Sequence, residues 1–197
     1  NSFVISNDLY KFAVMKKKMV FIMNPISGTT NKAGIPELIA KTLDTNTFDY
    51  EIRLTEHAGH AFEIATEAKD NGVDVVVAVG GDGTVNEVAR AIVHSNTALG
   101  IIPCGSGNGL ARHLMIPMQL KKAIEVINEY QIHDLDYGII NEHPFFCTCG
   151  MGFDAFVSMK FAEAGKRGPI TYAENILKEG LKYEPETYEI EDENGTI

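Results

Sequence analysis

The segment Gly-Gly-Asp-Gly-Thr at residues 80–84 constrains the fold more than any other part of the chain. The residues before it, 73–79, are mostly valine, which is typical of a parallel strand buried on both faces. The residues after it, 85–93, have helical periodicity. Three glycines in four residues allow a sharp turn and let backbone N–H groups approach a ligand. This strand–loop–helix unit predicts an anion site, because the start of a helix favours phosphate.

The start of this helix can be predicted in more detail. Thr84 and Glu87 have the spacing of a capping box, so we expect these two residues to cap the helix that leaves the loop. The alternative is a β-hairpin, since Asp82-Gly83 is a strong signal for a type I′ turn. The helical periodicity after Thr84 favours the capped helix.

Composition narrows the class of protein. The chain has 197 residues, enough for one α/β domain or for one complete domain and part of a second. A net charge of −10 argues against a nucleic-acid partner. Three cysteines and no export signal predict a cytoplasmic protein. No stretch approaches the roughly 18 apolar residues of a membrane span. We expect Cys147 and Cys149 to pack on one side of a strand rather than to bind zinc.

Four strand–loop–helix units follow one another. The predicted strands are residues 20–23, 50–54, 73–79 and 98–102, and a helix is expected to begin near Pro36. Such a series predicts an α/β fold with a mostly parallel sheet and helices on both faces. Ligands of such sheets bind at the carboxyl ends of the strands, where all four loops here are polar or glycine-rich.

The pattern changes after a helix at about 119–130. Residues 135–140, 144–149 and 187–190 are strand-like, and one helix is expected at 172–181. We therefore predict an N-terminal extension at 1–14, an α/β domain at 15–133 and an incomplete β-rich second domain at 134–197. Asn194-Gly195 is a favoured two-residue hairpin turn, yet only two residues follow it. The expectation is that the natural protein is longer.

Asp82 is the acid within the central loop. Its carboxylate could accept a proton from an attacking hydroxyl, or hold Mg²⁺ directly or through water. A local Asx turn is the structural alternative. The chain has neither a Walker A motif nor the glycine-rich loop of protein kinases, so a phosphate cradle here would be of another type.

Several other polar residues follow the predicted strands. Gly105, Ser106, Gly107 and Asn108 form a second glycine-rich cradle before a helix. Lys32 could reach a phosphate, although an exposed lysine usually does not. His57 and His60 have no third metal ligand at a fixed spacing, so solvated side chains are expected. The residues that serve either as ligands or as ordinary turn and cap residues are Asn24, Ser27, Thr55, Thr84 and Asn86.

Three motifs occur in order: Asn-Pro-Ile-Ser-Gly at 24–28, Gly-Gly-Asp-Gly-Thr-Val-Asn-Glu-Val at 80–88, and Pro-Cys-Gly-Ser-Gly-Asn-Gly-Leu-Ala-Arg at 103–112. Together they resemble the diacylglycerol kinase catalytic family, which includes bacterial soluble lipid kinases and sphingosine kinases. The resemblance covers about residues 19–190. The middle motif alone would be less specific, because NAD kinases and phosphofructokinases have similar loops.

The resemblance implies an ATP-dependent lipid kinase that uses Mg²⁺ and contacts the membrane surface peripherally. It also implies an α/β nucleotide domain followed by a β-sandwich lipid-binding domain. Asp82 matches the acid associated with Mg²⁺ and phosphoryl transfer, and Asp154 matches a position that contacts the lipid head group in sphingosine kinases. The implied nucleotide contacts are Asn24, Pro25, Ser27, Gly28, Thr55, Gly80, Gly81, Asp82, Gly83, Thr84, Asn86 and Ser106.

The chain departs from the family pattern in three places. Many bacterial members have Asp where this chain has Gly109, which is closer to the sphingosine kinases. Thr29 and Thr30 stand where a lysine often follows the first glycine. The late catalytic acid and a structural metal site of the family are implied to lie beyond Ile197, so this chain alone is expected to be inactive. The alternatives are an NAD kinase-like small-molecule kinase and a nucleotide-binding regulator without catalysis.

Overall fold

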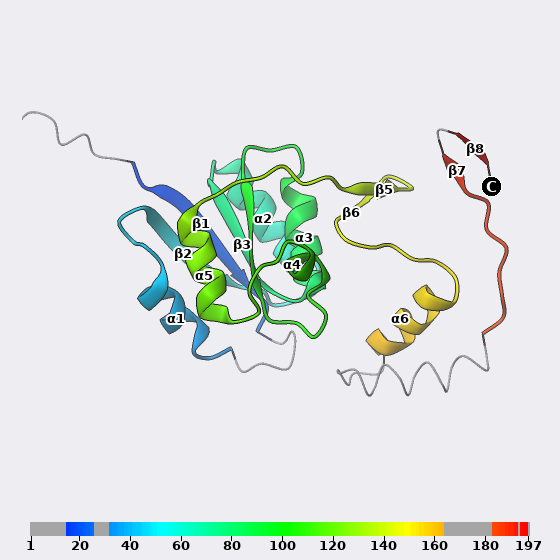
Figure 1. Ribbon diagram of the computed structural model, residues 1–197, viewed down its shortest axis with the longest axis horizontal. Coiled ribbons are helices and arrows are strands. Elements are labelled where there is room, and N and C mark those ends of the chain that lie inside the picture. Colours follow the sequence, from blue (N-terminus) through cyan, green and yellow to red (C-terminus); the bar gives the residue numbers. More distant parts are fainter. Residues whose placement is uncertain (1–14, 26–31, 164–182, 193, 197) are drawn as a thin grey trace, which may run out of the picture.

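A four-stranded parallel sheet forms the centre of the protein (Figure 1). The computed structural model describes residues 15–25, 32–163, 183–192 and 194–196. The strand order is β2-β1-β3-β4, and all three neighbouring pairs are parallel, which confirms the predicted α/β sheet. The strands are β1 (Lys17–Met23), β2 (Phe48–Leu54), β3 (Val75–Gly80) and β4 (Ala98–Pro103).

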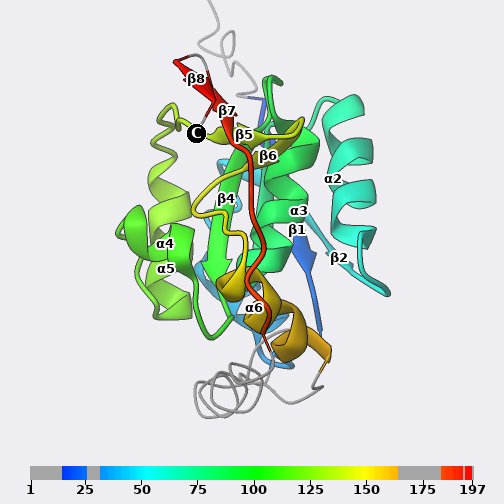
Figure 2. The ribbon, with the colours of Figure 1, turned by 90° about the vertical axis from the view of Figure 1, so that its right-hand side faces the viewer.

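Helices cover both faces of this sheet, as Figure 2 shows. On one face α2 (His60–Asp70) and α3 (Asp82–Ile92) pack against Val76 and Ala78 of β3. On the other face α1 (Ile35–Thr42) and α5 (Leu120–Glu129) pack against Val75, Val77 and Val79. All six residues of β3 are buried, so the valine run is a strand with two covered faces, as predicted. A short helix, α4 (Gly109–His113), follows β4.

The register of the strands brings their following loops to one edge. Met23 of β1 pairs with Leu54 and with Val79, and Gly80 of β3 pairs with Pro103. Backbone hydrogen bonds continue past the strand ends: Thr55 N–H donates to Met23 O (3.0 Å), and Cys104 N–H donates to Gly80 O (2.8 Å). The described starts of all four polar loops therefore lie side by side.

The chain beyond residue 137 lies outside this sheet (Figure 1). It contains an antiparallel pair, β5 (Gly138–Ile140) and β6 (His143–Phe145), then α6 (Phe153–Glu163), then a second pair, β7 (Glu191–Asp192) and β8 (Gly195–Thr196). The predicted strands at 135–140 and 144–149 are shorter than expected, and the one at 187–190 is wrong, because β7 begins at Glu191. Gly195 belongs to β8 rather than to the predicted turn.

Other predictions for this part have mixed outcomes. No pattern in the sequence predicted α6. Cys147 and Cys149 are exposed and lie outside the strands, so their predicted packing within a strand is wrong. The expected extension at 1–14 and helix at 172–181 lie outside the described residues. The division at 133/134 and the β-sandwich stay predictions.

Among the described helices, none is both long and apolar enough to cross a membrane.

Asp74 fastens the amino end of β1 to the start of β3. Its carboxylate accepts hydrogen bonds from Lys17 Nζ (2.9 Å) and from Lys18 N–H (2.8 Å). Burial by itself raises the pKa of Asp74, but the hydrogen bonds and charges of Lys17 and Lys18 outweigh it, and the pKa is lowered overall. A lowered pKa in the folded state stabilises the fold above the unfolded pKa of about 3.9, and this stabilisation is lost as the pH falls through the folded value.

We expect Asp74→Asn to lower the free energy of unfolding by about 1 kcal/mol at pH 7. The difference from the parent protein should shrink as the pH is lowered from 7 through the unfolded pKa of about 3.9 and below, because the unfolded parent then binds a proton at Asp74 more readily than the folded one. Urea unfolding across this pH range measures both effects. Glu37→Gln, which removes an exposed ion pair with Lys41, is the control and should change stability little. An Asp74→Asn deficit that does not change with pH would contradict this role of the carboxylate.

Candidate functional site

Two glycine loops lie back to back at the carboxyl edge of the sheet. Gly81 follows β3 and Gly105 follows β4. A Cβ placed on Gly105 would lie 2.5 Å from Gly81 Cα, and a Cβ on Gly81 would lie 3.1 Å from Gly105 Cα. Gly80 is also required, because a Cβ there would lie 2.6 Å from Thr84 Cβ. The backbones can approach this closely only because side chains are absent.

Asp82 joins the two loops. One carboxylate oxygen, Oδ2, accepts a hydrogen bond from Asn108 N–H (2.8 Å), and the other, Oδ1, accepts one from Gly109 N–H (2.6 Å). These partners are 26 and 27 positions away along the chain, so Asp82 is a long-range clamp rather than a local Asx turn. The negative carboxylate lies at the start of α4, where N–H groups have no partner within the helix.

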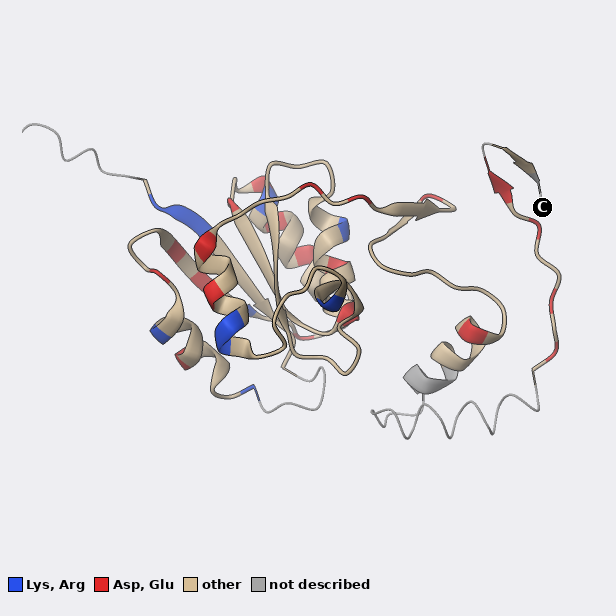
Figure 3. Ribbon diagram, viewed as in Figure 1, with Lys and Arg blue, Asp and Glu red and all other residues tan. Residues whose placement is uncertain are grey.

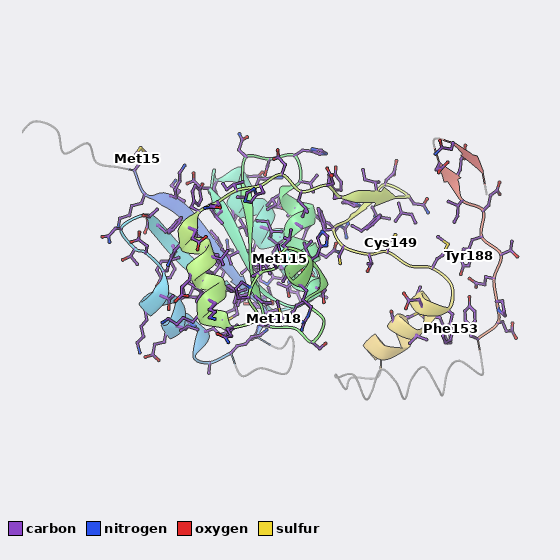
Figure 4. The ribbon with its side chains drawn as sticks, viewed as in Figure 1. Met15, Met115, Met118, Cys149, Phe153 and Tyr188 are labelled. Carbon is purple, nitrogen blue, oxygen red and sulfur yellow. The ribbon has the colours of Figure 1, made fainter. Side chains whose placement is uncertain are left out.

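Asn108 holds the second loop in shape. Its side-chain Oδ1 accepts a hydrogen bond from Gly105 N–H, and its Nδ2 donates to Gly105 O, both at 2.8 Å. Its Nδ2 also lies 3.9 Å from the sulfur of Met118, which is labelled in Figure 4. Asn108 is only 7% exposed and has a left-handed backbone (φ 56°). The structure thus gives this side chain a structural task, and its contact with a nucleotide stays a prediction.

The predicted capping box is wrong. The helix α3 begins at Asp82, with Gly81 as its N-cap and no side-chain capping bond. Thr84 is buried against Gly80. Glu87 reaches the neighbouring helix, where its Oε2 accepts a hydrogen bond from Ala61 N–H (3.1 Å). The first turn of α2 needs acceptors for its free N–H groups, and Glu87 supplies one.

Lys32 is buried rather than exposed, with only 5% of its surface accessible. Its ammonium donates a hydrogen bond to the carbonyl of Asn24, the first residue after β1. This charge acts on the thiol of Cys104. Burial raises the pKa of Cys104, and the positive charge of Lys32 partly opposes the rise. Lys32 therefore places a positive charge beside the start of the loop after β4.

The other predicted site residues differ in burial, and two of them are not described. Thr55 is buried next to the end of β1, and Asn86 is half-buried on α3. Ser106 and Gly107 are exposed, as are Pro25 and Gly83. Ser27 and Gly28 lie outside the described residues. Asp154 lies in the first turn of α6 against Gly150 and stays a weak candidate for contact with a substrate.

Cys147 lies next to the site, and nothing in its sequence context predicted this position. A Cβ on Gly109 would lie 3.1 Å from Cys147 Sγ and 3.6 Å from Asp82 Oδ1. The segment after β6 therefore reaches the Asp82 clamp. The family departure at Gly109 is the signal that could have pointed to it, because a larger residue at 109 would displace the thiol.

Comparisons with known proteins identify the family of this chain. The family model for the diacylglycerol kinase catalytic domain matches residues 18–140, so the chain belongs to this family. A diacylglycerol kinase of Staphylococcus saprophyticus is 36% identical over 163 residues, and one of Staphylococcus aureus is 35% identical over the same length. These matches cover 80% of this chain but only 53% and 51% of the relatives, so the chain spans about half of their length.

Solved structures show the same fold. The crystal structure of a diacylglycerol kinase from Bacillus anthracis is similar with a TM-score of 0.56 and 25% sequence identity. The match covers 66% of this chain and 48% of that one. The similarity supports the parallel α/β sheet and the family assignment.

The contact between Gly81 and Gly105 can be tested with two matched alanines. Gly105→Ala should lower the free energy of unfolding by about 1–3 kcal/mol, because its Cβ would overlap Gly81 and the two loops must separate. Gly83→Ala is the control: it adds the same methyl group in the first turn of α3, where no atom lies within 4 Å. Urea unfolding without ligand measures both. Equal stability of the two variants would contradict the back-to-back contact.

Proposed function

We propose that this protein transfers the γ-phosphate of ATP to a hydroxyl group of a lipid, such as a diacylglycerol or a sphingoid base. The observation that carries the proposal is the clamp of Asp82 across two glycine loops, in a chain of the diacylglycerol kinase family. In the reaction, the lipid oxygen forms a bond to the γ-phosphorus, the bond between the γ-phosphorus and the bridging oxygen breaks, and ADP leaves.

The loops fit a polyphosphate. The first N–H groups of α3 have no acceptor within the helix, and Gly83 in this first turn is exposed, so a ligand can reach them. Ser106 and Gly107 add a hydroxyl and an exposed backbone from the facing loop. We expect these groups to bind the phosphates, while the Gly81–Gly105 contact fixes the distance between the loops.

Asp82 fits a metal ion as well. Each carboxylate oxygen accepts one N–H hydrogen bond and has capacity for a second interaction. Asp82 is therefore the residue that we expect to hold Mg²⁺, directly or through water, or to receive the proton of the lipid hydroxyl. Bound Mg²⁺ would neutralise charge on the phosphates during transfer.

The charge distribution supports a small or lipid substrate rather than a nucleic acid. Among the described residues, Lys and Arg are dispersed over β1, α1, α4 and α5 in Figure 3 and do not form one continuous stripe. The net charge of −10 points the same way. Because the proposed acceptor is a lipid, we expect peripheral contact with a membrane surface.

An acceptor panel tests the proposed reaction. The full-length protein is incubated with labelled ATP, Mg²⁺ and diacylglycerol, sphingoid base, monoacylglycerol or NAD. We expect label in one or more of the lipids and little in NAD. Strong labelling of NAD with unlabelled lipids would replace the lipid kinase by an NAD kinase-like enzyme. Nucleotide binding without labelling of any acceptor would favour a regulator.

Asp82→Asn tests the carboxylate itself. An amide has one acceptor oxygen, so the variant keeps at most one of the two bonds to α4, and about 1–3 kcal/mol of stability should be lost. We also expect phosphate transfer to fall by about 10²-fold or more. Turnover is measured at saturating ATP and well below the unfolding temperature of the variant, so that loss of fold does not lower it.

The matched control for this variant is Asp49→Asn, which makes the same exchange at an exposed position in β2. It should leave turnover unchanged. Near-normal turnover of Asp82→Asn with Mg²⁺ would exclude the proposed role of Asp82 in the reaction.

A further inference from the structure

Two histidines and a glutamate converge at the corner between β2 and α2. His57 lies in the loop, His60 is the first residue of α2, and Glu63 lies one helical turn further on. One donor atom from each of the three side chains lies within 4.8 Å of the other two. The rings of His57 and His60 are parallel, with their centroids 4.6 Å apart. The structure thus brings Glu63 within reach of both histidines, a proximity that the spacing in the sequence did not predict.

The backbone of the turn creates this convergence. Gly59, between the two histidines, has a left-handed conformation (φ 85°) that residues with side chains rarely adopt. It reverses the chain so that His57 lies over the first turn of α2. Three residues that look unrelated in an extended chain become neighbours.

The hydrogen bonds of the rings determine which nitrogens can bind a ligand. His57 Nδ1 lies 3.0 Å from Ala58 O, and because a carbonyl only accepts, Nδ1 carries the proton. His57 Nε2 then has a free lone pair, and its ring is oriented by a carbonyl, as in many metal-binding histidines. His60 Nδ1 accepts a hydrogen bond from Glu56 N–H (3.0 Å). A metal ion at this nitrogen would replace that bond, and the exposed Glu56 N–H would turn to water at small cost.

We propose that His57, His60 and Glu63 form a binding site for one divalent transition-metal ion of the Zn²⁺ class. Two imidazoles and one carboxylate are a donor set that favours Zn²⁺, Ni²⁺ or Cu²⁺ over Mg²⁺. Tetrahedral ligands at about 2.1 Å from a metal lie about 3.4 Å apart. Because imidazole lone pairs lie in the ring plane, binding requires the stacked rings of His57 and His60 to rotate until both planes meet at the ion. The fourth position stays open to water, since His57 and Glu63 are exposed.

A metal titration of the tag-free protein tests the site. Cys147→Ser and Cys149→Ser are introduced first, because exposed thiols also bind zinc. Calorimetry with ZnCl₂ should show one saturable site per chain. Stoichiometric Zn²⁺ should also shift the imidazole NMR signals of His57 and His60.

Matched variants decide which residues bind the ion. His60→Gln and Glu63→Gln should each weaken binding by about tenfold or more. His143→Gln, which removes an exposed histidine of β6, should not change it. The proposal is overturned if the parent shows no saturable binding, or if the cluster variants bind Zn²⁺ as tightly as the parent. His60 is half-buried and the other substituted residues are exposed, and neither result depends on kinase activity.

Discussion

The contact between the backbones of Gly81 and Gly105 sets the geometry on which the candidate site depends. Two neighbouring parallel strands deliver these residues to the same edge, because Gly80 of β3 pairs with Pro103 of β4. No residue with a Cβ fits between the loops at this separation. The carboxylate of Asp82 then links the start of α3 to the start of α4. A charge in a polar loop is thus an integral part of the fold.

This arrangement gives Asp82 a structural role that is compatible with the chemical role proposed for it. The two N–H donors from α4 orient the carboxylate and occupy one interaction of each oxygen. The lone pairs that remain on the two oxygens then point in set directions. The position at which Asp82 could bind a metal ion or accept a proton is therefore fixed before a ligand binds. Such preorganisation lowers the cost of assembling a catalytic site.

The sequence predicted those features that arise from local patterns. The valine run of β3 and the glycines after it define a strand, a turn and a helix within about twenty residues. The errors concern partners that are distant in sequence. Glu87 has the spacing of a capping residue, but its acceptor oxygen is used by Ala61 of α2. Lys32 is buried and donates a hydrogen bond to the carbonyl of Asn24, and no pattern around residue 32 indicates this.

The hydrogen bond between Ala61 and Glu87 connects the candidate site at Asp82 with the proposed metal site. Ala61 follows His60 directly, and Glu87 lies in α3 five residues after Asp82. The hydrogen bond from Ala61 N–H to Glu87 therefore fixes the first turn of α2, which carries His60 and Glu63, relative to the helix that begins at the Asp82 clamp. Both helices pack on the same face of the sheet, so a displacement of the first turn of α2 is resisted by the first turn of α3. A metal ion bound at His57, His60 and Glu63 would thus stiffen the edge of the sheet at which the glycine loops meet.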